Sequence, residues 1–384
     1  MFTPNIKFTQ FKIKKNNKNV NRELKKLLSE NNSVIKSLTN NYENNFKIKH
    51  LLKYKKFFNN RIIGMGGSTL GTQAIYDFLN FKIKKKFTFL DNLNSSKKTI
   101  YKKKCLNLII SKSGNTIETI INSNIFIKKN QSNLFITENN QNHLRKIAEK
   151  LKAEIIDHNN FIGGRYSVLS EVGMLPAELM GLKISKFKQL NNLIKNKKFL
   201  NNLVNNVTAQ LHFIKSKKFN SIIINYDEKS KNLLNWYQQL IAESLGKKKV
   251  GLLPIVSNMP KDNHSVMQLY LDGFKNNFFT FFYVKENNSL TVKNNKIFKS
   301  QSYLNNKSID QIISSQKQAT ENVFNKKKIP FRSFEIGKRD ERTLGELFCF
   351  FILETILIGR SLRINPFDQP AVELIKTETK KILS

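Results

Sequence analysis

Hydroxyl side chains gather at the end of a predicted strand, between residues 105 and 119. The stretch reads CLNLIISKSGNTIET, and its apolar start is followed by Ser111, Ser113, Thr116 and Thr119. The short apolar run predicts a buried strand, and the isoleucines after it predict a helix. Because the free N–H groups and the dipole of a helix start favour an anion, the stretch suits a phosphomonoester. The same hydroxyls are also ordinary turn and capping residues, and this stretch alone leaves both interpretations open.

A glycine-rich turn, GMGGS at residues 64–68, follows a second predicted strand that ends at 61–63. An apolar-periodic helix is predicted from about Leu70 to Leu79, and glycine before it lets a backbone approach a ligand closely. The turn is not a dinucleotide-binding fingerprint, because Thr69 stands at the third glycine position, and no P-loop lysine follows. A tight turn between strand and helix explains the glycines equally well.

Four further charged residues could do chemistry, although each also has a structural interpretation. Arg165 follows two glycines in a chain that otherwise prefers lysine, which indicates a geometry that lysine cannot supply. Glu243 lies four residues after Gln239, so both occupy one face of a predicted helix. His264 starts another helix, and Lys376 lies in the terminal one. A surface arginine, a solvated carboxylate, a structural histidine and a surface lysine are the plain alternatives.

The elements that must position these residues alternate between strands and helices, which predicts an α/β fold with doubly wound, mainly parallel sheets. Ligands of such sheets bind at the carboxyl ends of the strands, where both turns lie. We expect two helices between residues 20 and 58. Further strands are expected near 87–90, 133–137, 153–157, 221–225, 250–256, 278–284, 291–292 and 329–336, and further helices near 139–152, 186–217, 231–246, 308–325 and 341–360.

Composition narrows the class of protein. A length of 384 residues with 40% hydrophobic residues predicts two or three globular domains. The net charge of +38 is typical of a nucleic-acid or membrane-surface binder, but the lysines are spread among many Asn and Ile residues, so compositional bias explains them as well. We expect no nucleic acid as the main partner and no membrane. A positive field should attract anionic substrates.

The two cysteines, Cys105 and Cys349, lie in apolar runs and are expected to be buried, reduced thiols. The N-terminus lacks a continuous apolar segment, so it does not predict a secretory signal, and we expect a cytoplasmic protein. The longest apolar run, residues 347–358, is too short to span a bilayer.

Six segments resemble, in the same order, motifs of the glucose-6-phosphate isomerase family, whose members have the sugar isomerase (SIS) fold. They are GMGGSTLG at 64–71, SKSGNTIET at 111–119, GGRYS at 163–167, Gln-x-x-x-Glu-Ser-x-Gly-Lys at 239–247, HSVMQ at 264–268 and FDQPAVELIK at 367–376. The resemblance implies two SIS-type subdomains, 61–190 and 191–360, after an N-terminal helical segment, 1–60, and before a C-terminal helical tail, 361–384.

The family's roles transfer to the matching positions. The resemblance makes Glu243 the base of an aldose–ketose isomerisation, Arg165 the cation that stabilises the enediolate, and His264 with Lys376 the pair that opens the sugar ring. It implies contacts to the substrate, at the phosphate from Ser111, Lys112, Ser113, Thr116 and Thr119 and at the sugar from Gly67, Ser68, Gln239 and Gln369.

The resemblance further implies a homodimer in which His264 reaches across the subunit interface. It implies no metal and no cofactor, and the sequence offers no His/Cys/carboxylate cluster for a metal. Two alternatives stay open. One is a non-catalytic SIS regulator that binds a phosphosugar. The other is a related isomerase acting on mannose 6-phosphate or an amino sugar phosphate. Amino-sugar enzymes of this fold usually join to a glutamine-hydrolysing domain with an N-terminal cysteine, and Phe at position 2 argues against that.

Overall fold

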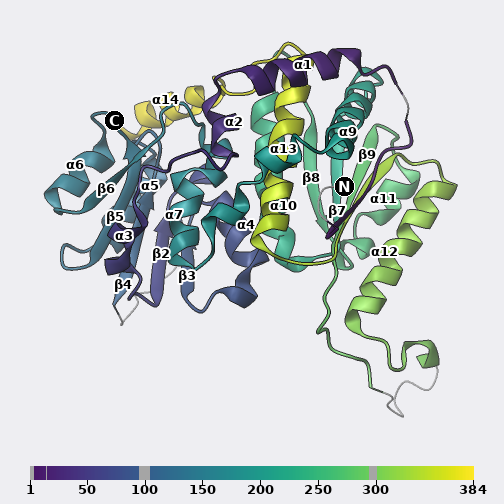
Figure 1. Cartoon of the computed structure of the whole chain (residues 1–384), viewed down its shortest axis with the longest axis horizontal. Coiled ribbons are helices and arrows are strands. Elements are labelled where there is room, and N and C mark those ends of the chain that lie inside the picture. The colour runs from purple at the N-terminus through teal and green to yellow at the C-terminus, as the bar shows by residue number, and fades with distance from the viewer. Residues whose placement is uncertain (1–3, 14, 95–103, 294–300) are drawn as a thin grey trace.

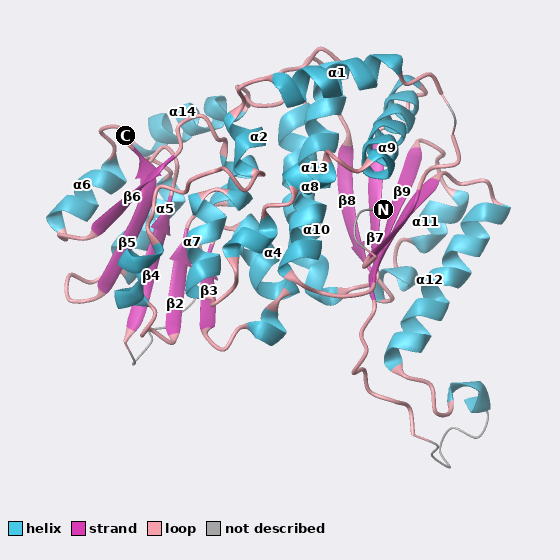
Figure 2. Cartoon of the chain, in the orientation of Figure 1, coloured by secondary structure: helices cyan, strands magenta, loops and turns pink. Residues whose placement is uncertain are grey.

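Two five-stranded sheets, separated by helices, form the frame of the protein (Figure 1). The computed structural model describes all residues except 1–3, 14, 95–103 and 294–300. Helices α4 (Leu70–Phe78), α10 (Lys231–Leu245) and α13 (Glu341–Ser361) lie between the sheets and pack on one another (Figure 2). The α/β fold with mainly parallel sheets is therefore confirmed.

The first sheet has the strand order β3-β2-β4-β5-β6, and all its strands are parallel. Their bounds are β2 (Asn59–Ile63), β3 (Lys86–Leu90), β4 (Cys105–Ile110), β5 (Ser132–Glu138) and β6 (Glu154–His158). Its own helices are α5 (Ile117–Phe126), α6 (His143–Lys150) and α7 (Glu171–Leu179). The chain passes from β2 to β3 on one side and then returns to β4 on the other. The switch point of the sheet therefore lies between β2 and β4, and both predicted turns leave the sheet there.

The second sheet has the order β1-β10-β9-β7-β8, in which only β1 runs antiparallel to its neighbour. Its strands are β1 (Ile6–Thr9), β7 (Asn220–Asn225), β8 (Leu253–Asn258), β9 (Asn277–Val284) and β10 (Phe331–Ile336). The helices around it include α8 (Leu190–Leu193), α9 (Lys197–Lys215), α11 (Met267–Asp272) and α12 (Ile309–Lys326). Read in the direction β8-β7-β9-β10, the four parallel strands follow the same order as β3-β2-β4-β5 of the first sheet, and β1 takes the place of β6. The repeated α/β pattern predicts this similarity.

The N-terminal segment differs from the predicted pair of helices. It contains α1 (Lys18–Ser29) and two short helices, α2 (Ser33–Ser37) and α3 (Ile48–Leu51), and it begins with β1, which we did not predict. Phe8 of β1 packs on Phe334 of β10 with ring centroids 4.6 Å apart. The prediction of a strand at 291–292 is wrong, because Thr291 makes only an isolated bridge to Ser308.

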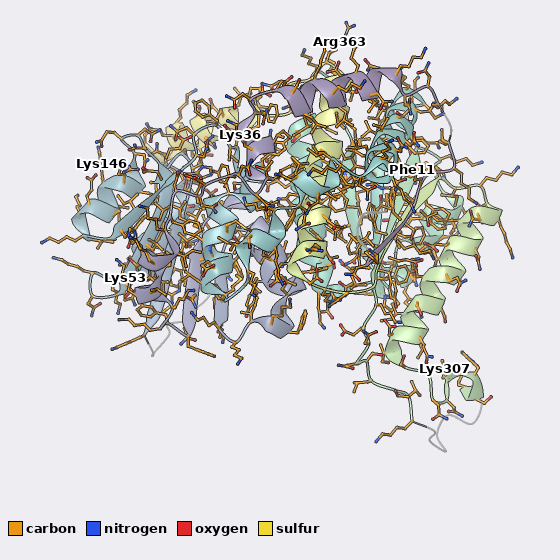
Figure 3. The ribbon with its side chains drawn as sticks, viewed as in Figure 1. Phe11, Lys36, Lys53, Lys146, Lys307 and Arg363 are labelled. Carbon is orange, nitrogen blue, oxygen red and sulfur yellow. The ribbon has the colours of Figure 1, made fainter. Side chains whose placement is uncertain are left out.

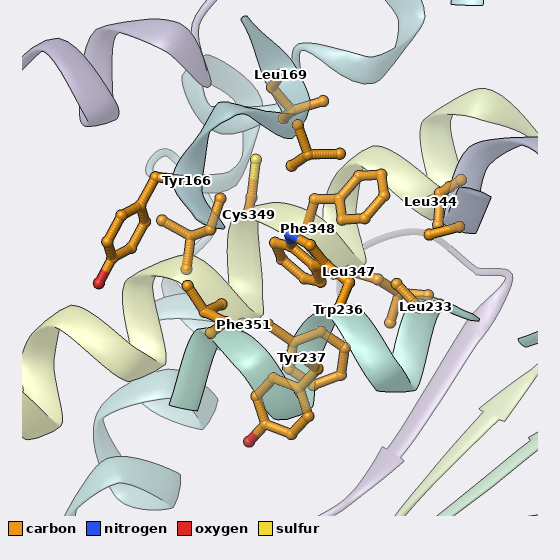
Figure 4. Close-up of a cluster of buried hydrophobic side chains, with 14 of the residues drawn as sticks. Tyr166, Leu169, Leu233, Trp236, Tyr237, Leu344, Leu347, Phe348, Cys349 and Phe351 are labelled. Carbon is orange, nitrogen blue, oxygen red and sulfur yellow. The ribbon is translucent and has the colours of Figure 1, made fainter. Parts of the chain in front are cut away.

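The core between the sheets is aromatic and holds a buried ionic group. Tyr237 of α10 stacks on Phe351 of α13 with ring centroids 4.2 Å apart (Figure 4). The Tyr237 hydroxyl donates to Glu354, which also pairs with Arg332 from β10, and none of the three is exposed to solvent. Cys105 and Cys349 are buried free thiols, as expected.

His158, at the end of β6, is a titratable group that folding dehydrates. Its side chain is 2% exposed, and Nδ1 lies 2.9 Å from the carbonyl oxygen of Asn159. Burial outweighs the effect of that carbonyl and lowers the pKa of His158 to about 4. The charged form of His158 is therefore disfavoured in the folded protein.

Lysines are distributed over the whole molecule. Figure 3 shows Lys36, Lys53, Lys146 and Lys307 on widely separated elements. The chain ends in α14 (Val372–Leu383), none of whose residues is buried. No helix in the described part of the chain is long and apolar enough to cross a membrane.

Candidate functional site

The two predicted turns lie against each other at the switch point of the first sheet. The glycine turn leaves β2 and passes through a short 3₁₀ turn at Gly66–Ser68. A Cβ on Gly64 would lie 2.7 Å from the carbonyl oxygen of Ile110, the last residue of β4. Only glycine permits this approach, so Gly64 holds the glycine turn beside the hydroxyl-rich turn that starts at Ser111.

The hydroxyl-rich turn is folded around buried oxygen atoms. Ser111, 2% exposed, lies with Oγ 3.0 Å from Oγ1 of Thr116, the residue before α5. Ser113 accepts a hydrogen bond from the Asn115 N–H at 3.3 Å. Thr119, 1% exposed, has an Oγ1 atom without a hydrogen-bond partner among the described residues. A buried hydroxyl without a partner at a helix start is a donor available to an anion.

Gly114 gives this turn its shape. Its φ of +65° belongs to the left-handed region, and a Cβ there would lie 2.0 Å from Oδ1 of Asn142. Asn142 in turn accepts the Arg145 N–H at 3.0 Å and so caps α6. The loop before α6 therefore packs against this turn, and no motif in the sequence indicates this role of Asn142.

The Lys112 side chain bonds to residues outside the hydroxyl-rich turn. Its Nζ donates to the carbonyl oxygen of Asn160 at 2.8 Å and lies 3.3 Å from the Glu138 carboxylate. Its ammonium group thus joins the turn to the ends of β5 and β6. The structure does not bring it to Thr116 or Thr119.

Arg165 lies at the centre of a second group of residues. A Cβ on Gly67 would lie 2.2 Å from the carbonyl carbon of Gly164, so the glycine turn packs directly on the turn that carries Arg165. Arg165 is 2% exposed, and its guanidinium donates from Nη1 to Gln369 Oε1 at 2.7 Å. The same Nη1 lies 3.5 Å from Oε1 of Glu243. Arg165, Glu243 and Gln369 are therefore together, as the motifs imply.

Glu243 is held by the helix that carries it. Gln239, one turn earlier on α10, donates from Nε2 to Glu243 Oε2 at 3.0 Å, while the Glu243 side chain keeps 25% of its surface exposed. Gln239 Oε1 is buried without a partner among the described residues. A Cβ on Gly66, whose φ is +51°, would lie 2.9 Å from Gln239 Nε2. The glycine turn, Gln239 and Glu243 therefore lie next to one another. Ser68 ends the glycine turn, and its side chain is partly exposed.

The segment that carries Gln369 also bonds to Lys247, two residues after the end of α10. Lys247 Nζ lies 2.8 Å from Oδ1 of Asp368, and this hydrogen bond lowers the pKa of Asp368. Arg165 Nη2 donates to the carbonyl oxygens of Pro366 and Asp368, at 2.7 and 3.1 Å. The turn at 365–369 is therefore bonded to both Arg165 and Lys247.

His264 and Lys376 are not bonded to this group among the described residues. His264 is an exposed residue at the end of a 3₁₀ turn, Lys261–His264, after β8. Lys376 is exposed on α14 and pairs with Glu373 at 2.6 Å. Neither side chain forms a hydrogen bond or ion pair with Arg165 or Glu243 in the part of the chain that the structure describes. Also within those residues, no three His, Cys, Asp or Glu side chains are grouped to hold a metal.

Sequence comparison relates the chain to one enzyme family. The sequence model of the phosphoglucose isomerase family matches residues 11–384. A glucose-6-phosphate isomerase of Methanocaldococcus jannaschii is 36% identical over 360 residues, which cover 87% of this chain and 86% of that one. One from Campylobacter jejuni is 32% identical over 344 residues, or 84% of each chain.

Solved structures share the fold. A hypothetical protein from Thermus thermophilus superposes with a TM-score of 0.84 at 22% identity, covering 96% of this chain and 94% of that one. A glucose-6-phosphate isomerase from Chlamydia trachomatis superposes with a TM-score of 0.70 at 19% identity, covering 88% and 72%. From the family match and the sequence identities, we conclude that this chain belongs to the phosphoglucose isomerase family.

Proposed function

We propose that this chain interconverts glucose 6-phosphate and fructose 6-phosphate, a reaction of glycolysis and gluconeogenesis. The observation that carries the proposal is the Glu243 carboxylate, partly exposed and 3.5 Å from the Arg165 guanidinium, beside an anion-binding turn at the switch point of a parallel sheet. Aldose–ketose isomerisation needs a carboxylate, a cation beside it and an anchor for the phosphate. One subunit holds a candidate for each of the three.

The phosphate binds to the turn after β4. The hydroxyls of Ser111, Ser113, Thr116 and Thr119 and the free N–H groups at the start of α5 donate to its oxygens. Thr119 Oγ1, which has no hydrogen-bond partner among the described residues, supports this role. A phosphate held there positions an open sugar chain whose other end reaches Glu243, so that binding energy from a remote group lowers the barrier to proton transfer.

Glu243 moves the proton between carbons 1 and 2 of the open sugar. One of its oxygens accepts from Gln239 and the other faces Arg165, so the carboxylate is held in one orientation. Removal of the proton gives a cis-enediol whose oxygen develops negative charge. Arg165, which is almost fully buried, stabilises that charge with little competition from water. The glycine turn with Gly67 and Ser68, together with Gln239 and Gln369, contacts the sugar hydroxyls.

Ring opening is assigned to His264 and Lys376. Both are exposed, and neither forms a hydrogen bond or ion pair with Glu243 among the described residues. We propose that His264 comes to the site from a second copy of the chain in a homodimer. A variant with His264→Gln, mixed with a Glu243→Gln variant, should regain activity as subunits exchange. Two inactive proteins that give no activity on mixing, at a concentration where both are dimeric, would contradict the shared site.

The first test of the proposed function is a coupled assay of the purified protein with fructose 6-phosphate, in which glucose 6-phosphate formation is followed. Mannose 6-phosphate is assayed in parallel. We expect turnover of fructose 6-phosphate that Glu243→Gln abolishes. Saturable binding of the phosphosugar without any turnover would instead favour a non-catalytic regulator that retains the anion-binding turn.

A further inference from the structure

A closed ring of hydrogen bonds surrounds the back of the Arg165 side chain. Arg165 Nε donates to Ser244 Oγ at 2.8 Å, and Ser244 Oγ lies 2.8 Å from the Tyr166 hydroxyl. Tyr166 donates to the carbonyl oxygen of Pro366 at 3.0 Å, and Arg165 Nη2 donates to that same oxygen at 2.7 Å. Arg165, Tyr166 and Ser244 are each 2% exposed or less, so water does not replace these bonds.

The protons in this ring can be arranged in only one direction. A guanidinium has donors and no acceptor, and a carbonyl oxygen accepts only. Because Tyr166 has one hydroxyl proton and gives it to Pro366, Ser244 must give its own proton to Tyr166. Ser244 Oγ is then left as an acceptor for Arg165 Nε. Each bond polarises the next, so the ring holds the guanidinium more firmly than separate bonds would.

The ring also determines which part of Arg165 remains for chemistry. A guanidinium has five N–H groups. Nε is bonded to Ser244, Nη2 is bonded to two carbonyl oxygens, and one N–H of Nη1 is bonded to Gln369. Among the described residues, one N–H of Nη1 has no hydrogen-bond acceptor, and it belongs to the atom that lies 3.5 Å from Glu243 Oε1.

We propose that Tyr166 and Ser244 are positioning residues, which orient Arg165 so that this single N–H meets the oxygen that becomes negative during proton transfer. The inference rests on the proposed function, since it assigns to Arg165 the stabilisation of an enediolate. Neither hydroxyl touches the substrate. Both act through the guanidinium, and their loss therefore affects the charged intermediate more than the bound sugar.

Tyr166→Phe isolates the hydroxyl from the rest of the side chain. The ring of residue 166 contacts Phe367 at 5.5 Å between centroids, and the Arg165 Cζ atom lies 5.2 Å from its centroid. Phenylalanine keeps both contacts. Figure 4 shows the Tyr166 hydroxyl at the edge of the apolar cluster and directed away from it. Without that hydroxyl, Ser244 loses the acceptor for its proton. A change of rotamer then lets it bond the carbonyl oxygen of Leu240 in its own helix, and this change moves Oγ away from Arg165 Nε.

The experiment compares Tyr166→Phe, Ser244→Ala and their double variant with the wild type and with Tyr54→Phe. Tyr54 is the control, because it is also a buried residue and its hydroxyl donates to Glu154 at 3.0 Å at the opposite end of the first sheet. Lys53 remains paired with Glu154 when that hydroxyl is lost. Steady-state kinetics gives kcat and KM. Calorimetry gives the affinity for a phosphorylated aldonate, which mimics the anionic enediolate, and for a phosphorylated sugar alcohol, which is neutral at those carbons. Urea unfolding reports stability.

We expect Tyr166→Phe and Ser244→Ala each to lower kcat about ten-fold to a hundred-fold with KM within about three-fold. Affinity for the aldonate should fall by a similar factor, while affinity for the sugar alcohol stays within about three-fold. The double variant should lose no more than the larger single loss, because both hydroxyls belong to one chain of bonds. Tyr54→Phe should change neither kcat nor the ratio of the two affinities.

An unchanged ratio of affinities in both single variants would overturn the inference, as would a double variant whose losses multiply. If Tyr166→Phe fails to fold, the inference is tested by the ratio of the two affinities measured with Ser244→Ala. If the wild type shows no turnover, the proposed function fails, but the ratio still reports whether the hydroxyls orient Arg165. Turnover with an unchanged ratio leaves the function in place and removes the positioning role.

Discussion

Gly67→Ala tests whether the two turns of the site must touch. In the structure, a Cβ on Gly67 would lie 2.2 Å from the Gly164 carbonyl carbon and 2.5 Å from the Arg165 amide nitrogen. Ordinary contacts of a Cβ begin near 3.4 Å. Because the atoms that it meets are backbone, no side-chain rotation can relieve the overlap, and the turns must separate by about 1 Å.

That separation is enough to disrupt the arginine. Arg165 follows Gly164 directly, and its bonds to Ser244 and Gln369 measure 2.8 and 2.7 Å. A shift of about 1 Å lengthens them beyond the range of a hydrogen bond. Since a misplacement of this size costs about a hundred-fold in rate, we expect kcat for fructose 6-phosphate to fall by about that factor.

The same loop supplies the control. A Cβ on Gly163, whose φ is −67°, would meet its nearest neighbours only at 3.8 and 3.9 Å, which is ordinary contact. Gly163→Ala should therefore keep kcat within about two-fold of the wild type, although Gly163 is the neighbour of Gly164, which Gly67 contacts. Both variants are assayed with fructose 6-phosphate, and urea unfolding confirms that each is folded at the assay temperature.

Equal kcat values for the two alanine variants would refute this reasoning. A Gly67→Ala protein that stays folded with kcat within about three-fold of the wild type would show that the turns can separate without harm to Arg165. The close packing would then be a matter of stability alone.

Three other perturbations follow from particular groups. Glu243→Gln should abolish exchange of the carbon-2 proton with solvent while phosphosugar affinity stays within a few-fold, and near-normal exchange would exclude Glu243 as the base. Thr119→Val removes a buried hydroxyl that has no partner among the described residues. It should raise the free energy of unfolding by about 1 kcal/mol and raise KM for fructose 6-phosphate at least about ten-fold. An unchanged KM would mean that this hydroxyl does not bind phosphate. Burial lowers the pKa of His158 to about 4 from 6.5 in the unfolded chain, so between those values only the unfolded state binds the proton and stability falls as pH falls. Between pH 7 and pH 5 the wild type should lose about 2 kcal/mol more than His158→Gln in urea unfolding, and equal losses would contradict the dehydrated ring.

The sequence predicted those parts of the fold that local patterns specify. The apolar runs that became β4, β5 and β9 are short, continuous and bounded by turn residues, which is typical of buried parallel strands. The alternation of strands and helices then placed both turns at one edge. The motifs identified the residues that the structure brings together around Arg165, including Glu243 and Gln369.

Long-range pairing was beyond such patterns. β1 is four residues long, and its partner β10 lies more than 300 residues later, so nothing local distinguishes it from a polar loop. The Ser244 and Tyr166 hydroxyls belong to quoted motifs, but their bonds join helix, turn and tail, and no spacing in the sequence shows that. The pairing of Lys112 with Glu138 depends likewise on neighbouring strand ends.

Arginine use in this lysine-rich chain supports the special place of Arg165. Four arginines are buried, namely Arg61, Arg165, Arg332 and Arg339, whereas Lys188 and Lys317 are the buried lysines among the described residues. Arg332 and Arg339 each donate through more than one nitrogen to fixed oxygens, from Glu354 and Asp227 respectively. An ammonium group is a point charge and cannot bridge oxygens in this planar manner. If a general compositional bias explains the abundance of lysine, the buried arginines mark positions that require a planar guanidinium able to bind two oxygens at once. Arg165→Lys should therefore lose activity almost as completely as Arg165→Ala, although it keeps the charge.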